Sequence, residues 1–407
     1  MIDAQVLVVG GGPAGSSVAT FLARAGVDVQ VLDRAHFPRP KPCAEYLSPE
    51  ASRLLEAMGA LDRVEQTGAA QLSGIRVRAP NGAVIEGDFI AAHGFRGFRD
   101  RGLSVRREVL DSILLDCARE AGARVHEGVR VTDVVRDADG RVAGVHTLTN
   151  GNAGELRADL VIAADGLRSV IARRTGLART TRWPRRLALV THYAGVADIG
   201  EHGEMHVEHD GYVGIADVGN GVTTVALVVP ASRAREFSED RGAFLDAWLC
   251  ARPHLAPRFA RAHRVSPVVV TGPFASHARR AWAPGVALVG DAADFFDPFT
   301  GEGIYAALRG GEMLSEAVRA SLRAPTPSAA DAPLAEYDRS RRREFGGKWV
   351  VERVIGAVVG SVPLINRAAR NLSARKDMAD LLIGVTGDFV PANQVIRLGY
   401  VWRTFGL

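Results

Sequence analysis

The chain has 407 residues, 47% hydrophobic and 24% charged, which is the composition of a folded protein with two or three domains. Fifty lysines and arginines against 46 acidic residues leave a net charge of +4, which is too small to predict binding to nucleic acid. The isolated cysteines Cys43, Cys117 and Cys250 predict neither a disulfide framework nor a metal site, and they favour a cytoplasmic location. We also expect no secretory signal and no conventional membrane span.

Residues 5–33, QVLVVGGGPAGSSVATFLARAGVDVQVLD, predict a strand, a glycine turn, a helix and a second strand. The turn carries G-x-G-x-x-G, whose glycines permit a tight turn, close approach of a pyrophosphate and packing of helix on strand. Asp33 ends the second strand, where an acid accepts hydrogen bonds from a ribose diol and favours FAD or NAD over NADP. We expect the dinucleotide to be bound by Gly10, Gly12, Pro13, Ala14, Gly15, Asp33 and Arg34.

Two later segments have a related pattern. Residues 158–174 predict a buried strand followed by Asp165 and Gly166. A further buried strand, GVALV, precedes GDAADFFDPFTGEGIYAAL at residues 290–308. This stretch predicts an aspartate after the strand, a turn around Pro298 and a helix starting around residues 301–303.

These three motifs resemble the flavoprotein monooxygenase superfamily, which includes aromatic hydroxylases, geranylgeranyl reductases and flavin-dependent halogenases. The resemblance covers most of residues 1–325 and implies FAD as the cofactor. It places Asp165 and Gly166 near the pyrophosphate, Asp291 at the ribityl chain, and Arg107, four residues before Asp111, at the flavin. The other residues that we expect at the cofactor are Gly290, Pro298, Gly301, Gly303 and Ile304. A helix start at this position offers free amides to the negative charge of a reduced flavin ring.

The predicted fold class is α/β, with a Rossmann-like FAD-binding domain, an inserted and mostly antiparallel substrate-binding β-sheet domain, and a helical carboxy-terminal segment. We assign residues 1–70, 99–180 and 269–325 to the first, residues 71–98 and 181–268 to the second, and residues 326–407 to the third. The proline-rich residues 323–333 predict a linker or exposed loop.

The predicted substrate sheet has β-branched, alternating strands. In the resembled family such a sheet forms the floor of the active site, so we expect a lipophilic or aromatic small-molecule substrate. Cys43 and Tyr212 are candidate catalytic residues; a structural role is the alternative for both, as for His192. Residues 37–51, which contain Cys43, resemble a loop of the reductases and halogenases. Those proteins have Cys-Gly in that loop, whereas Ala44 follows Cys43 here.

The His/Glu cluster of this sheet does not predict a metal site. Because side chains alternate along a strand, its four even-numbered members fall on one strand face, which is more often exposed to solvent than metal-binding. The cluster comprises His202, Glu204, His206, Glu208 and His209.

The reaction stays open between branches of the superfamily. We favour an O2-dependent monooxygenase that hydroxylates or epoxidises its substrate through a C4a-hydroperoxyflavin. The alternative is reduction of prenyl or polyene double bonds, as in geranylgeranyl reductases, which PFTGEGIYAALRGGE resembles more closely. A halogenase or a flavin-binding sensor without turnover is less favoured. Since no second G-x-G-x-x-G occurs, either transiently bound NAD(P)H or a separate flavin reductase supplies the electrons.

Residues 339–365 join a basic run to an apolar helical pattern. One interpretation is peripheral contact with a membrane surface. The favoured interpretation is a helix that caps the substrate domain, with its arginines solvated. The oligomeric state is left open by the sequence.

Overall fold

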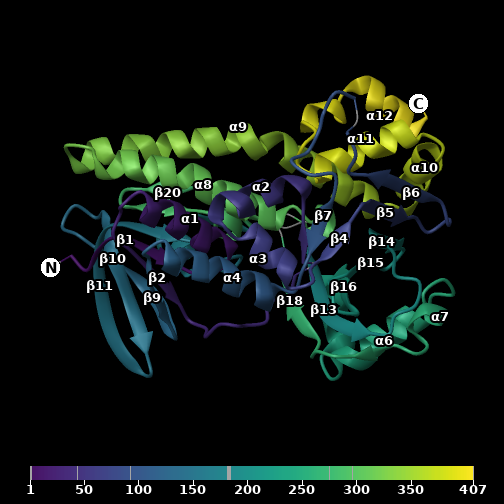
Figure 1. Cartoon of the computed structure of the whole chain (residues 1–407), viewed down its shortest axis with the longest axis horizontal. Coiled ribbons are helices and arrows are strands. Elements are labelled where there is room, and N and C mark those ends of the chain that lie inside the picture. Colours follow the sequence, from purple (N-terminus) through teal and green to yellow (C-terminus); the bar gives the residue numbers. More distant parts are fainter. Residues whose placement is uncertain are drawn as a thin grey trace.

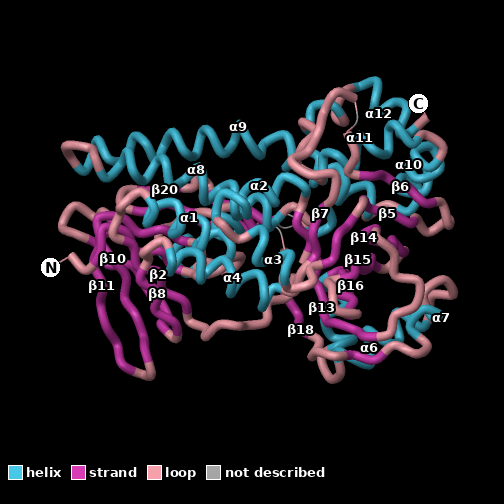
Figure 2. Tube along the Cα trace, in the orientation of Figure 1, coloured by secondary structure: helices cyan, strands magenta, loops and turns pink. Residues whose placement is uncertain are grey.

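The structure is a computed structural model, which describes residues 2–43, 45–91, 93–180, 185–274, 276–295 and 297–406. Two large sheets lie side by side, with helices between and above them (Figures 1 and 2). The sheet containing β1 (Ala4–Val9) is at the amino-terminal end, and the one containing β13 (Arg186–Ala194) is beneath the carboxy-terminal helices. This arrangement confirms the predicted α/β class with a helical carboxy-terminal segment.

The first sheet is parallel over most of its width and has the order β20-β21-β11-β1-β2-β8. Its strands are β2 (Val29–Asp33), β8 (Arg124–Glu127), β11 (Asn152–Ala163), β20 (Trp282–Ala283) and β21 (Val286–Leu288). The residues of β1 from Val6 to Val9 pair with both β11 and β2. Parallel strands that are covered on both faces consist of continuous apolar residues. For this reason the strands of this sheet could be predicted from the sequence.

Helices cover one face of the first sheet, and a β-meander extends from it. The helices are α1 (Pro13–Arg24), α4 (Arg107–Glu120) and α8 (Gly303–Leu322), with α2 (Pro49–Met58) and α3 (Leu61–Gln66) beside them. The short α5 (Val170–Arg174) instead contacts β9. The meander consists of β9 (Val129–Arg136) and β10 (Val142–Thr149) with the long β11. Two small sheets complete this region, one of β3 (Tyr46–Leu47), β7 (Gly102–Ser104) and β4 (Ala70–Leu72), the other of β12 (Ala178–Thr180), β19 (Ser276–Ala278) and β22 (Asp294–Phe295).

The second sheet has the order β17-β13-β16-β15-β14-β5-β6, with β18 paired to β13. Its other strands are β5 (Gly74–Arg78), β6 (Val84–Asp88), β14 (His202–Glu208), β15 (Gly211–Asp217), β16 (Val222–Pro230), β17 (His263–Arg264) and β18 (Val269–Thr271). All its pairs are antiparallel except β14 with β5. One face packs on η1 (Ala231–Phe237), α6 (Arg241–Cys250) and α7 (Ala256–Phe259). The other face carries apolar residues that pack against Phe295, Phe299 and the carboxy-terminal helices. The predicted domain boundaries stay a prediction.

The carboxy-terminal segment contains α9 (Pro327–Val359), α10 (Val362–Ser373), α11 (Lys376–Thr386), η4 (Ala392–Gln394) and α12 (Leu398–Phe405). The predicted linker or exposed loop at residues 323–333 is right only for residues 323–326, because α9 begins at Pro327. The Thr326 hydroxyl accepts a hydrogen bond from the Ala329 amide (3.2 Å), and Pro327 occupies the first turn, where its missing N–H leaves no bond unmade. In the described residues no single helix is long and apolar enough to span a membrane; α9 and α10 pass that test only as a pair bent by 110°.

Helices α1 and α8 pack in close contact, and the Ser17 hydroxyl donates to the Leu308 carbonyl across it (2.8 Å). A Cβ at Gly311 would lie 2.5 Å from Ser17 Oγ and 3.0 Å from the Val18 amide nitrogen. A Cβ at Gly346, in α9, would instead have no other atom of the described residues within 4 Å. Both glycines lie inside helices, so replacing either with alanine changes the intrinsic helix propensity by a similar amount.

We expect Gly311→Ala to lower the free energy of unfolding by about 1–3 kcal/mol, because α1 and α8 must separate. Gly346→Ala should instead raise it by up to about 1 kcal/mol, since the helix gains propensity without a clash. Urea titration of both variants measures the difference. Equal effects of the two substitutions would contradict the close α1–α8 contact.

Candidate functional site

The glycine loop after β1 meets the second sequence motif at the end of β11. Gly10 has φ +105°, and a Cβ there would collide with the carbonyl oxygen of Ala164. A Cβ at Gly15 would fall on the carbonyl oxygen of Gly10. Both glycines are therefore required by close backbone packing, as their spacing predicts.

The third motif lies against the same loop. Gly290, φ +61°, opens η2 (Gly290–Ala292), and its Cβ would lie 2.9 Å from the Cβ of Ala14 in α1. Asp291, the next residue, lies close enough to Lys41 for its charge to favour the protonated amine. The structure thus brings three motifs, far apart in the sequence, to the carboxyl ends of β1, β11 and β21.

The start of α1 has free hydrogen-bond donors. The first helical hydrogen bond runs from the Ser16 amide to the Gly12 carbonyl. The amides of Ala14 and Gly15 therefore have no backbone acceptor within the described residues, and Pro13 has no N–H to satisfy. Free amides at a helix start bind phosphate.

Asp165 provides a second unsatisfied group. Its Oδ2 accepts from the Val170 amide (2.6 Å), and burial raises its pKa against the opposing bonds from Ser169 and Val170. Its Oδ1 is buried and has no partner among the described residues. Gly166, φ +79°, follows, and a Cβ there would lie 3.5 Å from Lys41 Nζ.

Three cations surround these backbone donors, and sequence reasoning missed two of them. Lys41 lies beside Gly166, and Arg39 Nη2 would be 3.5 Å from a Cβ at Gly12. Burial lowers the pKa of Lys41, and Asp291 opposes this shift. Arg107 forms a buried bidentate pair with Asp111, at 2.7 and 2.8 Å. Burial disfavours its charge, but Asp111 and Cys43 together outweigh that effect and raise the pKa of Arg107.

The acid at the end of β2 supports the loop directly. Asp33 Oδ2 accepts from the Gly11 amide and Oδ1 from the Ala35 amide, both at 2.8 Å. Its remaining lone pairs are compatible with the predicted ribose contact. Arg34 is exposed, and its predicted cofactor contact stays a prediction.

A second helix start lies at the other end of this region. Asp297 caps η3 (Pro298–Thr300) by accepting from the Phe299 amide (3.1 Å), and Gly301 takes φ +74°. A Cβ on Gly301 would lie 2.8 Å from the ring of Tyr46. The next helix, α8, begins at Gly303, as the sequence predicts. Its first helical hydrogen bond is from Ala306 to Glu302, so the amides of Gly303 and Ile304 have no backbone acceptor in the described part of the chain.

Asp297 also ties this loop to the second sheet. The Tyr212 hydroxyl donates to Asp297 Oδ1 (2.7 Å), and Arg186 Nη1 donates to Oδ2 (2.6 Å). Burial raises the pKa of Tyr212 well above its ordinary value, and Asp297 adds to this shift. Tyr212 is therefore a neutral phenol that positions the loop, which favours the structural alternative over a catalytic role.

Cys43 and His192 meet at a buried glutamate. Glu45 Oε1 accepts from the Arg107 amide (2.9 Å), and Oε2 is 2.7 Å from His192 Nε2. Cys43 is partly buried beside the Arg107 guanidinium, and its Sγ is 3.4 Å from the Glu45 amide nitrogen. This contact joins the cofactor region to β13. Ala44 lies outside the described residues.

A buried acid–base cluster lies behind the second helix start. Glu302 is 5% exposed, and burial raises its pKa to about 7, although Lys348 opposes this. Lys348 of α9 pairs with Asp388 and lies 4.5 Å from the centre of the Tyr305 ring. Glu352, one turn further along α9, also has a raised pKa because of burial and the nearby Glu302.

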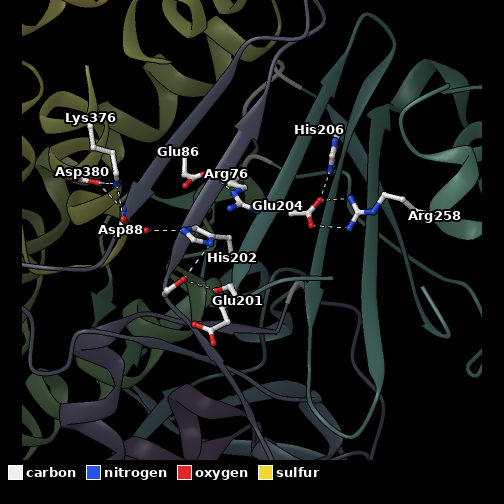
Figure 3. Close-up of polar contacts among 11 residues, drawn as sticks. Arg76, Glu86, Asp88, Glu201, His202, Glu204, His206, Arg258, Lys376 and Asp380 are labelled. Atoms are coloured by element: carbon white, nitrogen blue, oxygen red, sulfur yellow. Dashed lines mark hydrogen bonds and ion pairs between the residues drawn. The ribbon is translucent and has the colours of Figure 1, made fainter. Parts of the chain in front are cut away.

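His202, Glu204 and His206 of the His/Glu cluster lie on β14 and form ion pairs (Figure 3), whereas His209 lies beyond the strand and is exposed. His202 Nε2 is 2.8 Å from Asp88 Oδ1, and Glu204 binds both His206 (2.8 Å) and Arg258. Although burial opposes it, these partners lower the pKa of Glu204 to about 2. Within the described residues no three His, Cys, Asp or Glu side chains are arranged to hold a metal ion.

Two free helix starts, three cations and an unsatisfied buried carboxylate fit a long, doubly charged dinucleotide such as FAD. The amides of Ala14 and Gly15 with Arg39, Lys41 and Arg107 would hold its pyrophosphate, and the start of α8 its ring. The fold and the site define an FAD-dependent oxidoreductase.

The comparisons with known proteins give the family. Residues 3–349 match the model of the FAD binding domain family. The chain is 30% identical over 398 residues to digeranylgeranylglycerophospholipid reductase 2 of Methanopyrus kandleri, covering 96% of this chain and 94% of the relative. It is also 30% identical over 332 residues to menaquinone reductase of Mycobacterium tuberculosis, covering 77% and 76%. The chain belongs to this FAD-binding flavoprotein family.

Solved structures share the fold at lower identity. The myxobacterial chondrochloren halogenase superposes with a TM-score of 0.81 and 22% identity, covering 92% of this chain and 90% of that one. A geranylgeranyl bacteriochlorophyll reductase-like protein of Thermoplasma acidophilum gives 0.72 and 22%, covering 99% and 96%.

We expect Asp291→Ala to weaken FAD binding about tenfold or more, through loss of a charge-assisted hydrogen bond. Flavin absorbance of the purified protein, and titration of stripped protein with FAD, measure this loss. Asp331→Asn is the control, because Asp331 pairs with Arg141 at the start of α9 (2.6 Å). Full flavin occupancy in Asp291→Ala would contradict the assignment.

Glu302 predicts a pH-dependent stability of the FAD-free protein. Its folded pKa of about 7 exceeds the ordinary value of 4.5, so its contribution is complete below pH 4.5 and is lost as the pH rises through 7. Relative to Glu302→Gln, the wild type should lose on the order of 3 kcal/mol of unfolding free energy across this interval. Urea titrations of both proteins at a series of pH values measure the loss, and parallel curves would refute the prediction.

Proposed function

We propose that this flavoprotein reduces carbon–carbon double bonds of a prenyl chain carried by a lipid or a quinone. The observation that carries the proposal is the apolar face of the second sheet, directly opposite the loop at the start of α8. Val77, Val190 and Val228 of this face pack in one cluster with Phe295 and Phe299. An aliphatic chain lying between this sheet and the loop would meet apolar side chains, which favours a lipophilic substrate over a polar one.

The relatives support the same chemistry over the alternatives. Two of them carry the names digeranylgeranylglycerophospholipid reductase and menaquinone reductase, and both names describe reduction of prenylated molecules. The O2-dependent monooxygenase favoured from sequence has no counterpart among these names, and the structures named halogenases support the fold alone.

The chain's own residues supply the setting for this reaction. Saturating a double bond consumes two electrons and two protons; bound FAD, once reduced by the electron donor, would supply the electrons. The free amides of Gly303 and Ile304 would stabilise negative charge at the start of α8. The Glu302 carboxyl, which holds its proton below about pH 7, keeps a proton within this water-poor region.

Asp297 holds the loop and the sheet at a fixed separation. It binds Arg186 of β13 and Tyr212 of β15 while capping η3. Arg186 also donates to the Gly356 carbonyl of α9 (3.1 Å). The apolar face and the loop are therefore aligned by one carboxylate. The electron donor, NAD(P)H or a separate reductase, and the cytoplasmic location remain predictions.

The test is turnover without oxygen. Reduced with dithionite under anaerobic conditions, the holoprotein should convert a geranylgeranyl lipid or menaquinone into products that gain two hydrogen atoms per double bond, measured by mass spectrometry. Asp291→Ala, which is expected to bind FAD more weakly and therefore to turn over less, is the control. Incorporation of isotopically labelled dioxygen into the product, with no anaerobic turnover, would instead establish the monooxygenase.

A further inference from the structure

The last helix leaves two of its large apolar side chains exposed to solvent. On α12, Tyr400 and Thr404 face the protein: the Tyr400 hydroxyl donates to the Met378 carbonyl (2.9 Å), and the Thr404 side chain is buried. Leu398 and Trp402, four residues apart on the same helical face, are 79% and 56% exposed. A surface helix of a globular protein normally buries its apolar face and exposes its polar one.

Exposed apolar side chains concentrate in the same part of the molecule. Six of the eleven large apolar residues that are exposed in the described chain lie beyond residue 349. They are Val350, Val354, Leu364, Ile396, Leu398 and Trp402. The end of α9 and the helices α10, α11 and α12 lie together at one end of the molecule (Figure 1).

Positive charge accompanies the exposed face of α12. Arg397 and Arg403 flank Leu398 and Trp402 in the sequence, both are exposed, and neither forms an ion pair with the described residues. The neighbouring Arg367 and Arg375 donate to backbone carbonyls at the end of the chain, those of Gly406 and Arg403. No acidic residue follows Asp388 in the sequence.

We propose that α12 is a docking surface for an anionic lipid bilayer, into which Leu398 and Trp402 insert while Arg397 and Arg403 contact lipid phosphates. Tryptophan favours the interface between water and lipid, and arginines beside an apolar face add attraction to anionic headgroups. The docking surface rests on the proposed function in one respect: membrane contact would bring a prenyl-lipid reductase to its substrate.

A second copy of the chain fits the exposed face of α12 less well than a lipid bilayer does. A symmetric contact through α12 would bring Arg397 and Arg403 of both copies together. A helix of eight residues also offers far less than the roughly 800 Å² per partner that stable interfaces bury.

The basic run within residues 339–365, for which membrane contact was the less favoured interpretation from sequence, is engaged in ion pairs. Arg341 is buried in ion pairs with Asp294 and Asp338. Arg342 and Arg343 pair with acids of their own helix, Asp338 and Glu336. The run stabilises α9 and its contact with the nucleotide-binding region, and the membrane-facing charge lies on α12.

Co-sedimentation of the full-length holoprotein with vesicles tests the proposal, without any turnover. The wild type should bind vesicles of phosphatidylcholine mixed with phosphatidylglycerol, more weakly at high salt, and bind pure phosphatidylcholine far less. Leu398→Glu/Trp402→Glu should weaken binding about tenfold or more. Val265→Glu, at a residue 44% exposed beside β17, is the matched control and should bind as the wild type does.

Depth is measured by quenching of tryptophan fluorescence with brominated lipid chains. The wild type should be quenched and Trp402→Phe should lose most of the quenching. Undiminished vesicle binding by the double glutamate variant would overturn the proposal, as would a wild-type dimer that the same variant converts to a monomer. Vesicle binding without reductase activity would contradict the proposed function but would still support the docking surface.

Discussion

Close packing of backbone against backbone at three turns is the constraint on which the rest of this structure depends. The loops after β1, β11 and β21 approach so closely that Gly10, Gly15 and Gly290 have no room for ordinary side chains. This approach leaves the amides at the start of α1 uncovered and places Gly166 and Asp291 beside Lys41. A dinucleotide is recognised there mainly by main-chain donors, which only a fixed fold can hold in place.

The second end of the site depends on side chains from distant segments. Asp297 joins the loop before α8 to two strands of the second sheet, and Glu45 joins Arg107 to His192. Both carboxylates are buried and satisfied by several donors, so removing either would leave charged or polar partners unpaired. The region between the two sheets is therefore held by a few shared acceptors.

Sequence reasoning succeeded where the signal is local. A buried strand followed by glycines at fixed spacing specifies both the turn and the helix after it, so the starts of α1 and α8 were predictable. Arg39 and Lys41 were missed because their approach to the glycine loop depends on the path of residues 34–43, which has no periodic pattern. The partners of Tyr212 and His192 lie 85 and 147 residues away, and no spacing rule joins them. The start of α9 was missed because prolines outweighed the Thr326 cap.

The long α9 contacts the rest of the molecule at successive points along its 33 residues. Asp331 pairs with Arg141 beside β10, Arg341 with Asp294, Lys348 with Asp388, and the Gly356 carbonyl with Arg186. An α-helix turns by about 100° per residue. Inserting one residue near its middle would rotate every later contact out of register at once. The number of residues between these contacts is therefore fixed. Insertions and deletions in homologous chains should be confined to the ends of α9.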